Sequence, residues 1–590
     1  MSSDKLVFDL SQEIEGSPNV FVRKDWLNIL DNNNQNYNAN QSTIDTSQLS
    51  NSNKYLSYRE AYLLCPMLLT LSTTNGVFAP ATSATSADYA IGLKNWFGTI
   101  IHSYTLDYNG TTIIQQTPYI NMWNSFKLMT SLSLDDVNTS GATIGFYPDD
   151  PLSWTYNTIA ETSGNGTGVC NNSNSTAVGA PSNITTTFNK YDSGNGNQGF
   201  LKRQQYINFD PQAVPNSFGT VTSTYSDLIP VQSVTNLWKS YIFNKQNYAA
   251  GGLIEIAITA TIYLKHIHSF FAMTPLLKGV FMKMTMNLNN TTTTFSVTGS
   301  AVAVPVTSEI NLLTTSVPVG GVCPIMIASG AAGQGGFNTK AITTTGAAAT
   351  YTATLSVGAR CLNSTVTSLV GYTDAPLSKS IYLYVPAYTF NPVFEQAYLS
   401  SPVKQINYTD IYQFQVINIG ANQQFNNLLT NGIANIKSVL LIPFYSATGG
   451  STELPVGIPV FQSPFDPAGT GPSSPLCLFS NFNIVVSGQN AIYNTERYSF
   501  EQFNNQVYGC NSVNGGMTDG ISSGLINALG FENNYCYYYV NVSRMLPVEE
   551  SVPKSVQILG TNQSANAVDL WCFIEYGVDV SIDILTGSRV

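Results

Sequence analysis

The sequence from residue 96 to residue 126, WFGTIIHSYTLDYNGTTIIQQTPYINMWNSF, decides the fold, because a similar pattern returns much later in the chain. The second copy, residues 482 to 503, reads FNIVVSGQNAIYNTERYSFEQF. Each copy predicts a strand, a tight turn, a second strand and an aromatic-rich helical segment, in that order. The chain therefore contains the same local unit twice.

The turns identify each copy as a β-hairpin followed by an aromatic segment. The first turn is Asn109-Gly110 and the second is Ser487 to Asn490. An Asn-Gly or glycine-containing turn between apolar runs is a strong hairpin signal. In both copies the second strand ends five residues before a tyrosine, Tyr119 or Tyr498. Two similar units this far apart predict two copies of one β domain and not a short-period solenoid.

A low charge content limits the classes of protein to which this chain can belong. Of 590 residues only 10% are charged, whereas 12% are aromatic. Ordinary soluble proteins carry roughly a quarter charged residues. A surface of neutral polar groups suits extracellular, adhesive or self-assembling proteins, because few charges lose water on association. Such a composition is less typical of a metabolic enzyme.

The net charge of −11 argues against direct DNA or RNA binding as the main activity. Neutralisation of phosphates dominates that affinity, so proteins that coat nucleic acid are normally basic. Arg23-Lys24 and Lys202-Arg203 are the adjacent basic pairs, and neither extends into a basic stripe.

Cysteine usage and apolar runs indicate the compartment. The eight cysteines contain no C-x-x-C pair, which predicts reduced, mostly buried thiols in a reducing compartment: Cys65, Cys170, Cys323, Cys361, Cys477, Cys510, Cys536 and Cys572. Residues Met1 to Lys5 open no apolar signal region, so Sec-type secretion is not expected. No run of 18 or more apolar residues exists, and the longest candidate, Leu253 to Leu264, predicts a buried strand and not a membrane span.

Composition divides the chain into an arm and two β domains. Residues 1–53 are polar and rich in Asn, Gln and Ser, which predicts an extended N-terminal arm. Residues 54–300 form the first predicted domain, with a surface insertion at about 138–200 that is rich in Asn, Gly, Ser and Thr. Residues 301–590 form the second predicted domain.

Alternation of apolar and polar residues predicts strands in both domains. Residues 279–288 alternate cleanly, as a half-buried strand does. The second domain is expected to resume at the strand-like run Tyr382 to Pro386. One helix is expected from Gln423 to Ile436, ahead of a strand from Val439 to Phe444. Many short strands, frequent Gly, Pro and Asn turns and few helices predict an all-β sandwich or jelly roll.

Two glycine motifs match catalytic or nucleotide-binding strings but lack their context. Gly194 to Gly199 spells G-x-G-x-x-G inside the Asn/Gly-rich insertion, without the strand and helix that a dinucleotide site needs. Gly520 to Gly524 spells G-x-S-x-G, but a hydrolase of that type needs a histidine downstream of Ser522, and all three histidines lie upstream. The first string is therefore interpreted as part of the insertion and not as a nucleotide site, and the second as a glycine-bounded turn.

Histidines and paired aspartates are weak candidates for chemistry. Besides His102, the chain has His266 and His268, which would share one face of a predicted strand, but no Cys or third His lies nearby to complete a metal site. Asp135-Asp136 and Asp149-Asp150 have the residue type that glycoside hydrolysis uses, yet adjacent aspartates in polar loops are more often solvated turn residues. The sequence therefore predicts no catalytic residue, no metal ligand and no cofactor.

The aromatic segments Tyr119 to Phe126 and Tyr498 to Phe503 have two interpretations. Aromatic side chains can form a platform on which nucleic-acid bases stack. Such platforms usually carry interleaved Lys or Arg, which these segments lack. Packing against the β-sandwich is therefore the favoured interpretation.

The chain resembles the double jelly-roll major capsid proteins of the virophage, polinton-like virus and nucleocytoplasmic large DNA virus lineage. The resemblance covers most of the chain after the arm, and is weakest at residues 138–200 and 300–370. It rests on the order of several strings: Trp96 to Leu128, Pro275 to Gly279 with the strand after it, Tyr384 to Tyr398, Lys404 to Asp410, Val439 to Phe444, Tyr537 to Arg544, Lys554 to Thr561 and Leu585 to Gly587.

The resemblance implies an architecture and a function. It implies two eight-stranded jelly rolls per chain, three chains per pseudo-hexagonal capsomer, and an icosahedral shell around double-stranded DNA, built inside the infected cell. The implied partners are other copies of the chain, penton proteins and minor or cement capsid proteins. The insertion at 138–200 would form an outward tower, and the arm would contact neighbours beneath the shell. The alternative is a carbohydrate-binding or carbohydrate-cleaving β-sandwich surface protein.

Overall fold

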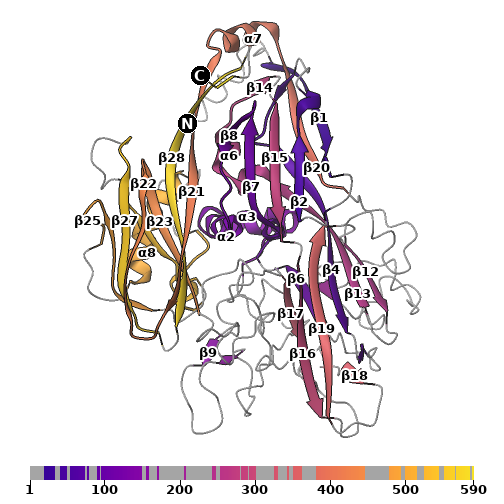
Figure 1. Ribbon diagram of the computed structural model, residues 1–590. Helices are drawn as coiled ribbons and strands as arrows, with labels where there is room; N and C mark the ends of the chain where they lie inside the picture. The colour runs from indigo at the N-terminus through magenta and orange to yellow at the C-terminus, as the bar shows by residue number, and fades with distance from the viewer. Residues whose placement is uncertain are drawn as a thin grey trace, which may run out of the picture.

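The fold consists mostly of antiparallel strands with a few short helices (Figure 1). The computed structural model describes residues 19–33, 37, 40–49, 54–73, 76–78, 89–93, 95–148, 155–157, 169–171, 205–206, 242–247, 253–278, 281–289, 291–300, 325–329, 342–344, 350–361, 380–445, 478–492, 498–513, 524–533, 535–543, 551–564, 567–584 and 588–589. Because antiparallel strands dominate the described elements, the predicted all-β class is confirmed.

Eight strands from the first two thirds of the chain form two facing sheets. The first sheet has the order β1 (Phe21–Leu30), β20 (Tyr382–Phe390), β4 (Tyr62–Thr73) and β13 (Leu253–Tyr263). The second sheet has the order β2 (Gln41–Asp45), β15 (Met282–Leu288), β7 (Ile101–Tyr108) and β8 (Thr111–Ile114). We call these eight strands the first jelly roll, because numbered along the chain they read 1-8-3-6 and 2-7-4-5, the order of two Greek keys.

Eight strands after residue 400 repeat this order. One sheet runs β21 (Val403–Ile419), β28 (Val568–Asp583), β23 (Ile436–Tyr445) and β26 (Tyr538–Asn541). The other runs β22 (Gln424–Ile433), β27 (Lys554–Asn562), β24 (Phe479–Val486) and β25 (Gln489–Asn490). These strands again read 1-8-3-6 and 2-7-4-5, and we call them the second jelly roll. The predicted double jelly-roll fold is confirmed by this topology.

Other strands extend the first jelly roll or form small sheets. Its first sheet is extended by β3 (Tyr55–Leu56), β14 (Leu277–Lys278), β12 (Ile242–Asn247), β19 (Thr350–Cys361) and β16 (Thr291–Ser300). The small sheets contain β6 (Tyr89–Leu93), β11 (Gln205–Tyr206), β17 (Ile325–Ser329), β9 (Thr155–Asn157), β10 (Val169–Asn171), β5 (Gly76–Phe78) and β18 (Ile342–Thr344).

The helices are short and lie mainly between strands of different sheets. The α-helices are α2 (Ile120–Ser131), α3 (Leu134–Ile144), α5 (Leu264–Ile267), α6 (Ser269–Met273), α7 (Pro392–Leu399), α8 (Phe500–Val513) and α9 (Ala528–Asn533). Two 3₁₀ turns, η1 (Ser47–Leu49) and η2 (Phe97–Ile100), precede β3 and β7.

The sequence repeat corresponds to the same three elements in each jelly roll. The first copy forms β7, β8 and α2, and the second forms β24, β25 and α8. Both hairpins turn through two residues with positive φ, 46° and 81° at Asn109 and Gly110, 49° and 83° at Ser487 and Gly488. Positive φ at both positions is the requirement of a type I′ hairpin turn. The second short strand occupies Gln489–Asn490, two residues earlier than the sequence pattern predicts.

Strand pairing changes the predicted organisation at two places. Within the predicted arm, residues 21–30 and 41–45 are β1 and β2, which pair with β20 and β15. The predicted second domain included residues 350–361 and 382–390, but β19 and β20 pair with β4 of the first sheet. Composition predicts neither the pairing of β1 and β2 nor that of β19 and β20, because strand partners that lie so far apart in the sequence leave no local signal.

The helix predicted from Gln423 to Ile436 is wrong, since residues 424–433 form strand β22. Phe425, Leu429 and Ile433 recur every four residues, a spacing that fits a helical face and also one face of a strand. β22 pairs with β27 through two register irregularities, after Leu428 and after Thr430. Pairing with β27, which is distant in the sequence, selects the strand over the helix here.

Other predicted segments have mixed outcomes. Residues 282–288 alternate buried and less buried side chains as predicted, and residues 253–263 form a strand. Within the predicted insertion at 138–200, residues up to 144 belong to α3, and β9 and β10 are the other described elements. The remainder of that insertion lies almost entirely outside the described residues.

Candidate functional site: the interface between the jelly rolls

Helix α2 lies between the two jelly rolls and is buried on all sides. Ten of its twelve residues are buried, including Trp123, Phe126 and Met129. A helix that is buried around its whole circumference has no side free for water, so its buried polar side chains need partners inside the protein. Its polar side chains bond to backbone carbonyls: Ser125 Oγ donates to Asn121 O at 2.8 Å and Thr130 Oγ1 to Phe126 O at 2.9 Å. These bonds offset the cost of burying the hydroxyls.

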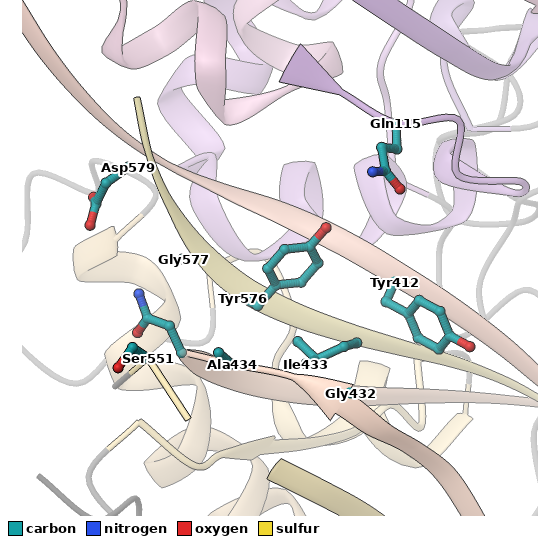
Figure 2. Close-up of a pocket in the computed structure, with 10 residues that line it drawn as sticks. Gln115, Tyr412, Gly432, Ile433, Ala434, Ser551, Tyr576, Gly577 and Asp579 are labelled. Atoms are coloured by element: carbon teal, nitrogen blue, oxygen red, sulfur yellow. The ribbon is translucent and has the colours of Figure 1, made fainter. Parts of the chain in front are cut away.

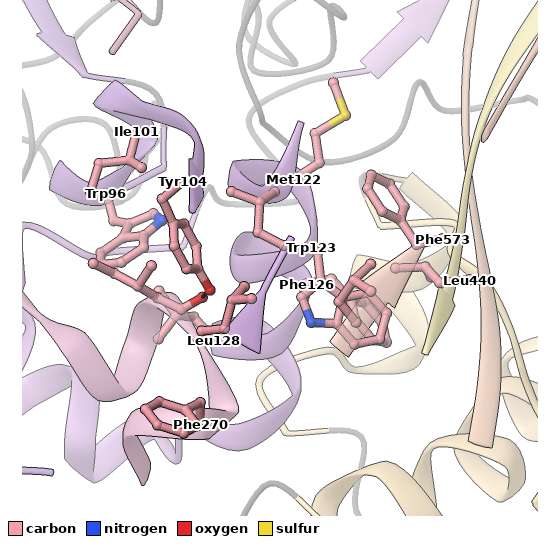
Figure 3. Close-up of a cluster of buried hydrophobic side chains, with 14 of the residues drawn as sticks. Trp96, Ile101, Tyr104, Met122, Trp123, Phe126, Leu128, Phe270, Leu440 and Phe573 are labelled. Carbon is pink, nitrogen blue, oxygen red and sulfur yellow. Dashed lines mark hydrogen bonds between the residues drawn. The ribbon is translucent and has the colours of Figure 1, made fainter. Parts of the chain in front are cut away.

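The aromatic side chains of α2 pack against the sheet of the second jelly roll (Figure 3). The ring centroids of Phe126 and Tyr539 are 5.4 Å apart and the rings are stacked, and the centroids of Phe126 and Tyr537 are 5.2 Å apart. Trp123 approaches Phe573 of β28 at 6.3 Å. The interpretation of the aromatic segments as packing elements is confirmed here, and also for Tyr498 and Phe503, which are 2% and 0% exposed.

Hydrogen bonds also join the two jelly rolls. Thr117 Oγ1 donates to Ile411 O at 2.8 Å, and the Tyr408 hydroxyl donates to Ile113 O at 2.8 Å. Ser269 Oγ donates to Thr409 O at 2.6 Å. In each pair the donor and the acceptor lie far apart in the sequence. No sequence signal pairs them, because each donor is an ordinary Thr, Tyr or Ser in an Asn/Thr-rich chain.

A buried polar cluster lies at the same interface. His268 and Asp410 are each 4% exposed. His268 Nδ1 accepts the backbone N–H of Phe270 at 3.1 Å, which assigns the proton to Nε2, and Nε2 then donates to Asp410 Oδ1 at 3.4 Å. The other carboxylate oxygen of Asp410 accepts the Tyr576 hydroxyl at 3.3 Å. Buried polar groups need such partners, so the cluster fixes how the two jelly rolls meet.

The two candidate histidines do not share a strand face as predicted. His266 belongs to α5, and His268 lies between α5 and α6, where its side chain caps α6. Burial, together with the charges of Lys265 and Lys127, lowers the pKa of His266 to about 3. In the part of the chain that the structure describes, no three His, Cys, Asp or Glu side chains gather in a way that could hold a metal ion. His266 is thus a buried side chain, and His268 is a helix cap.

The remaining candidate motifs have structural roles or lie outside the described residues. Asp135 and Asp136 occupy the first turn of α3, where Asp136 and Ser133 form a capping box. Hydrogen bonds from Ser133 hold the pKa of Asp136 below its usual value. Gly524, the last residue of the G-x-S-x-G string, has φ of +68° and lies against the backbone of α2. Residues 194–199, 520–523 and 149–150 lie outside the described residues.

Three cysteines have described side chains, Cys65, Cys536 and Cys572, and all three are buried as predicted. Burial raises the pKa of the Cys572 thiol. A buried thiol with a raised pKa is a poor nucleophile, because the thiolate is the reactive form. Cys572 therefore contributes to the core of the second jelly roll.

One pocket of about 560 Å³ opens at the edge of the interface (Figure 2). It is lined by polar and aromatic side chains together with a glycine-containing loop: Gln115, Tyr412, Gly432, Ile433, Ala434, Asn435, Ser551, Tyr576, Gly577 and Asp579. Asp579 is the single carboxylate among these lining residues. Hydrolysis of a glycosidic bond ordinarily uses two carboxylates, and the described lining residues supply one.

Among the described residues, no helix combines the length and the apolar character that a membrane span requires.

Comparison with known proteins gives similarity at the level of solved structures. No family model and no curated protein matches the sequence. The chain is similar to a structure of the Sputnik virophage, with 11% identity and a TM-score of 0.47, over 98% of this chain and 90% of that chain. It is also similar to the mavirus major capsid protein, with 11% identity, a TM-score of 0.40 and coverage of 98% and 92%. The Faustovirus major capsid protein gives 9% identity, a TM-score of 0.39 and coverage of 98% and 94%.

Proposed function

We propose that the chain is a major capsid protein of a virion. Three copies form a homotrimeric capsomer of pseudo-hexagonal outline, and the capsomers tile an icosahedral shell around a double-stranded DNA genome. The observation that carries the proposal is the repetition of one eight-strand topology within a single chain. Three such chains supply six similar lobes, which suits a hexagonal lattice.

The packed junction between the jelly rolls supports this proposal. In the chain, the first jelly roll ends at β20 and the second begins at β21. A lattice subunit must hold its two lobes at a fixed angle, and α2 is packed between them with ten buried residues. The cross-roll hydrogen bonds of Thr117, Ser269 and Tyr408 add directional constraints.

The sequence features agree with a structural, non-enzymatic role. The resemblance of the sequence strings points to the double jelly-roll capsid lineage. The net charge of −11 is consistent with a shell that leaves neutralisation of DNA to other proteins or cations and makes no specific contact with nucleic acid. Penton proteins and minor or cement proteins are the further partners that we propose, in addition to other copies of the chain.

Light scattering on the purified full chain tests the proposal. One chain has a mass of 63.9 kDa, and the particle in solution should have three times that mass. Negative-stain images of that particle should have a roughly hexagonal outline. A stable monomer at micromolar concentration would contradict the proposal.

A carbohydrate-binding surface protein is the second candidate, because the pocket beside Tyr412 combines aromatic rings with amide and carboxylate groups. Aromatic rings pack against the apolar faces of sugars, and a few placed polar groups then bind the hydroxyls. Replacement of Tyr412 by Ala should abolish glycan binding on this hypothesis and leave assembly unchanged on the capsid hypothesis. Glycan-array binding by a monomer would favour the second candidate.

A further inference from the structure

The pocket at the edge of the interface is lined by residues of both jelly rolls (Figure 2). Gln115 follows β8 of the first jelly roll, whereas Tyr412 belongs to β21 and Tyr576 to β28 of the second. In Figure 2 the Gln115 side chain extends towards the strands that carry the two tyrosines. The pocket volume of about 560 Å³ lies within the range of small-molecule sites, roughly 300–1,000 Å³. A molecule bound there therefore contacts both jelly rolls.

Two tyrosine rings form the aromatic part of the pocket. Tyr412 lies two residues after Asp410, which pairs with Tyr576 of β28, so the two tyrosines are diagonal neighbours on one face of the sheet. The Tyr576 ring is held in place, because its hydroxyl donates to one oxygen of Asp410 at 3.3 Å and His268 of the first jelly roll donates to the other. Tyr412 is 39% exposed, so its ring is accessible. The pocket thus combines one fixed ring with one accessible ring.

The polar groups of the pocket include both donors and acceptors of hydrogen bonds. They are two carboxamides, two hydroxyls and one carboxylate, from Gln115, Asn435, Ser551, Tyr412 and Asp579. Asn435 Oδ1 is buried and accepts no hydrogen bond from the described residues. A ligand hydroxyl that donates to Oδ1 would supply the partner that a buried acceptor needs. Hydroxyl groups, which both donate and accept, match this set of side chains.

The charges at the pocket favour a neutral ligand. Among the described lining residues none is Lys, Arg or His, so the cationic clamp that binds phosphate or carboxylate is missing there. Asp579 lines the pocket, and Lys437 lies beside it, since Lys437 Cε is 3.1 Å from the position that a Cβ atom on Gly577 would occupy. These opposite charges offset each other, so neither an anion nor a cation gains a net attraction.

We infer that the pocket binds one ring of a neutral saccharide, which contacts both jelly rolls and strengthens their junction. The apolar faces of the sugar pack against Tyr412 and Tyr576, and its hydroxyls bond to Gln115, Asn435 and Asp579. A ligand that binds only while the jelly rolls are in contact stabilises that contact. The inference goes beyond the proposed function, because it adds a ligand site to a capsid protein. The second candidate function, in contrast, has glycan binding in place of the capsid role.

Binding of methyl glycosides to the trimeric full chain tests the inference. The neutral probes are methyl glucoside, methyl mannoside and methyl galactoside, and the charged probes are spermidine and inorganic phosphate. Isothermal titration calorimetry at millimolar concentrations should give saturable binding of at least one glycoside and of neither charged probe. Tighter binding of an oligosaccharide that ends in the same sugar would identify the end of a glycan as the occupant, and equal binding a free sugar. Binding of no glycoside, or of a charged probe alone, would overturn the inference.

Substitutions of exposed lining residues locate the bound glycoside. Gln115→Ala removes the lining side chain that the first jelly roll contributes, and the loss of its hydrogen bond should weaken binding about tenfold. Tyr412→Ala should weaken binding at least as much, whereas Tyr412→Phe keeps the ring and should weaken it less. The matched control is Gln116→Ala, which changes the next residue, exposed and not among the lining residues. Unchanged affinity in both alanine variants of the lining would overturn the inference.

Hydrogen exchange measures whether the ligand joins the two jelly rolls. Helix α2 is packed between them, so the bound glycoside should slow exchange of its amides in the wild type. Gln115→Ala, saturated with the same glycoside, should lack this slowing, because its ligand contacts only the second jelly roll. Slowing confined to β21 and β28 in the wild type would overturn the effect on the junction.

Failure of the inference and failure of the proposed function give different results. A trimer that binds no glycoside overturns the inference alone. A monomeric wild type that binds a glycoside overturns the capsid proposal and supports the second candidate function.

A further measurement applies if the variants fail to fold: hydroxyl-radical labelling of the wild type. The glycoside should lower labelling of Tyr412 several-fold, with Leu134, which is 68% exposed on α3, as the internal reference. Equal labelling of Tyr412 with and without the glycoside would overturn the inference.

Discussion

The two jelly rolls use the same hairpin and helix in different ways. In the first jelly roll, α2 has ten buried residues among twelve and packs against the sheet of the other jelly roll. In the second, α8 packs against its own jelly roll, where Phe503 contacts Phe531 at 5.0 Å and Gln506 Oε1 accepts the Asn541 N–H at 2.9 Å, and it also contacts α2. A duplicated element therefore keeps its backbone, while its neighbours decide whether it is enclosed between the two jelly rolls or keeps one side in solvent.

The side chains of the two helices follow these roles. α2 reads INMWNSFKLMTS, with large apolar residues around the whole circumference. α8 reads FEQFNNQVYGCNSV, with Glu501 and Asn505 exposed on one side. A helix enclosed between two jelly rolls buries its polar side chains as well as its apolar ones, whereas a helix with one free side keeps polar residues exposed there. Substitutions in the two helices and at the contacts between the jelly rolls test these different roles.

The largest effect is expected from Phe126→Ala in α2. Phe126 is fully buried, and its removal leaves a cavity against Tyr537 and Tyr539, which costs about 3–5 kcal/mol of unfolding free energy. Because the cavity lies between the jelly rolls, calorimetry should resolve two unfolding transitions. Phe503→Ala in α8 is the matched control, since it should lower only the stability of the second jelly roll. A single transition for Phe126→Ala with a loss below about 1 kcal/mol would refute the role of α2.

A smaller loss is expected from Gly524→Ala. A Cβ atom there would overlap the carbonyl oxygen of Met129 in α2, and the residue also has φ of +68°. Strain and crowding together should lower the unfolding free energy by roughly 2–4 kcal/mol. Gly488→Ala has a similar φ of +83° but nothing within 4 Å of the added atom, so urea unfolding should give a loss of only about 1 kcal/mol. Equal losses would show that Gly524 matters only for its backbone angle.

Tyr408→Phe tests the hydrogen bonds across the interface. The hydroxyl donates to Ile113 O at 2.8 Å, and its loss should cost about 1–2 kcal/mol because the carbonyl stays buried. Tyr412→Phe on the same strand is the control, since that side chain is 39% exposed and the change should cost less than about 0.5 kcal/mol. Chemical denaturation of both variants measures the difference. Similar values for the two would mean that the cross-roll bond adds nothing.

The smallest effect concerns pH and His266. Burial lowers its pKa from 6.5 to about 3 in the folded chain, so below pH 6.5 the unfolded chain binds a proton that the folded chain does not. Stability is therefore lost as pH falls from about 6.5 towards 3. His266→Phe keeps a ring beside Trp96 and Tyr263 and is the reference variant. Relative to it, the wild type should lose about 0.7 kcal/mol between about pH 7 and about pH 6. Parallel pH dependences of the two proteins would contradict this assignment.

The elements that sequence predicts well are those with local causes. The Asn109-Gly110 and Ser487-Gly488 turns need positive φ, which Gly and Asn accept readily, so the hairpins are visible in the sequence. Residues 282–288 alternate because one face of β15 meets the core. Asp135 and Asp136, which the sequence predicts to be solvated turn residues, form the exposed first turn of a capped helix.

The sequence by itself determined that the chain is an all-β protein with one hairpin-and-helix unit used twice, because turn chemistry and side-chain alternation act over a few residues. Tertiary structure alone decided that residues 21–30 and 382–390 pair as β1 and β20, that residues 424–433 form a strand, and that His268 meets Asp410. The first and last of these are contacts between positions that lie far apart in the chain. Their energy depends on burial and partner geometry, which no local pattern records.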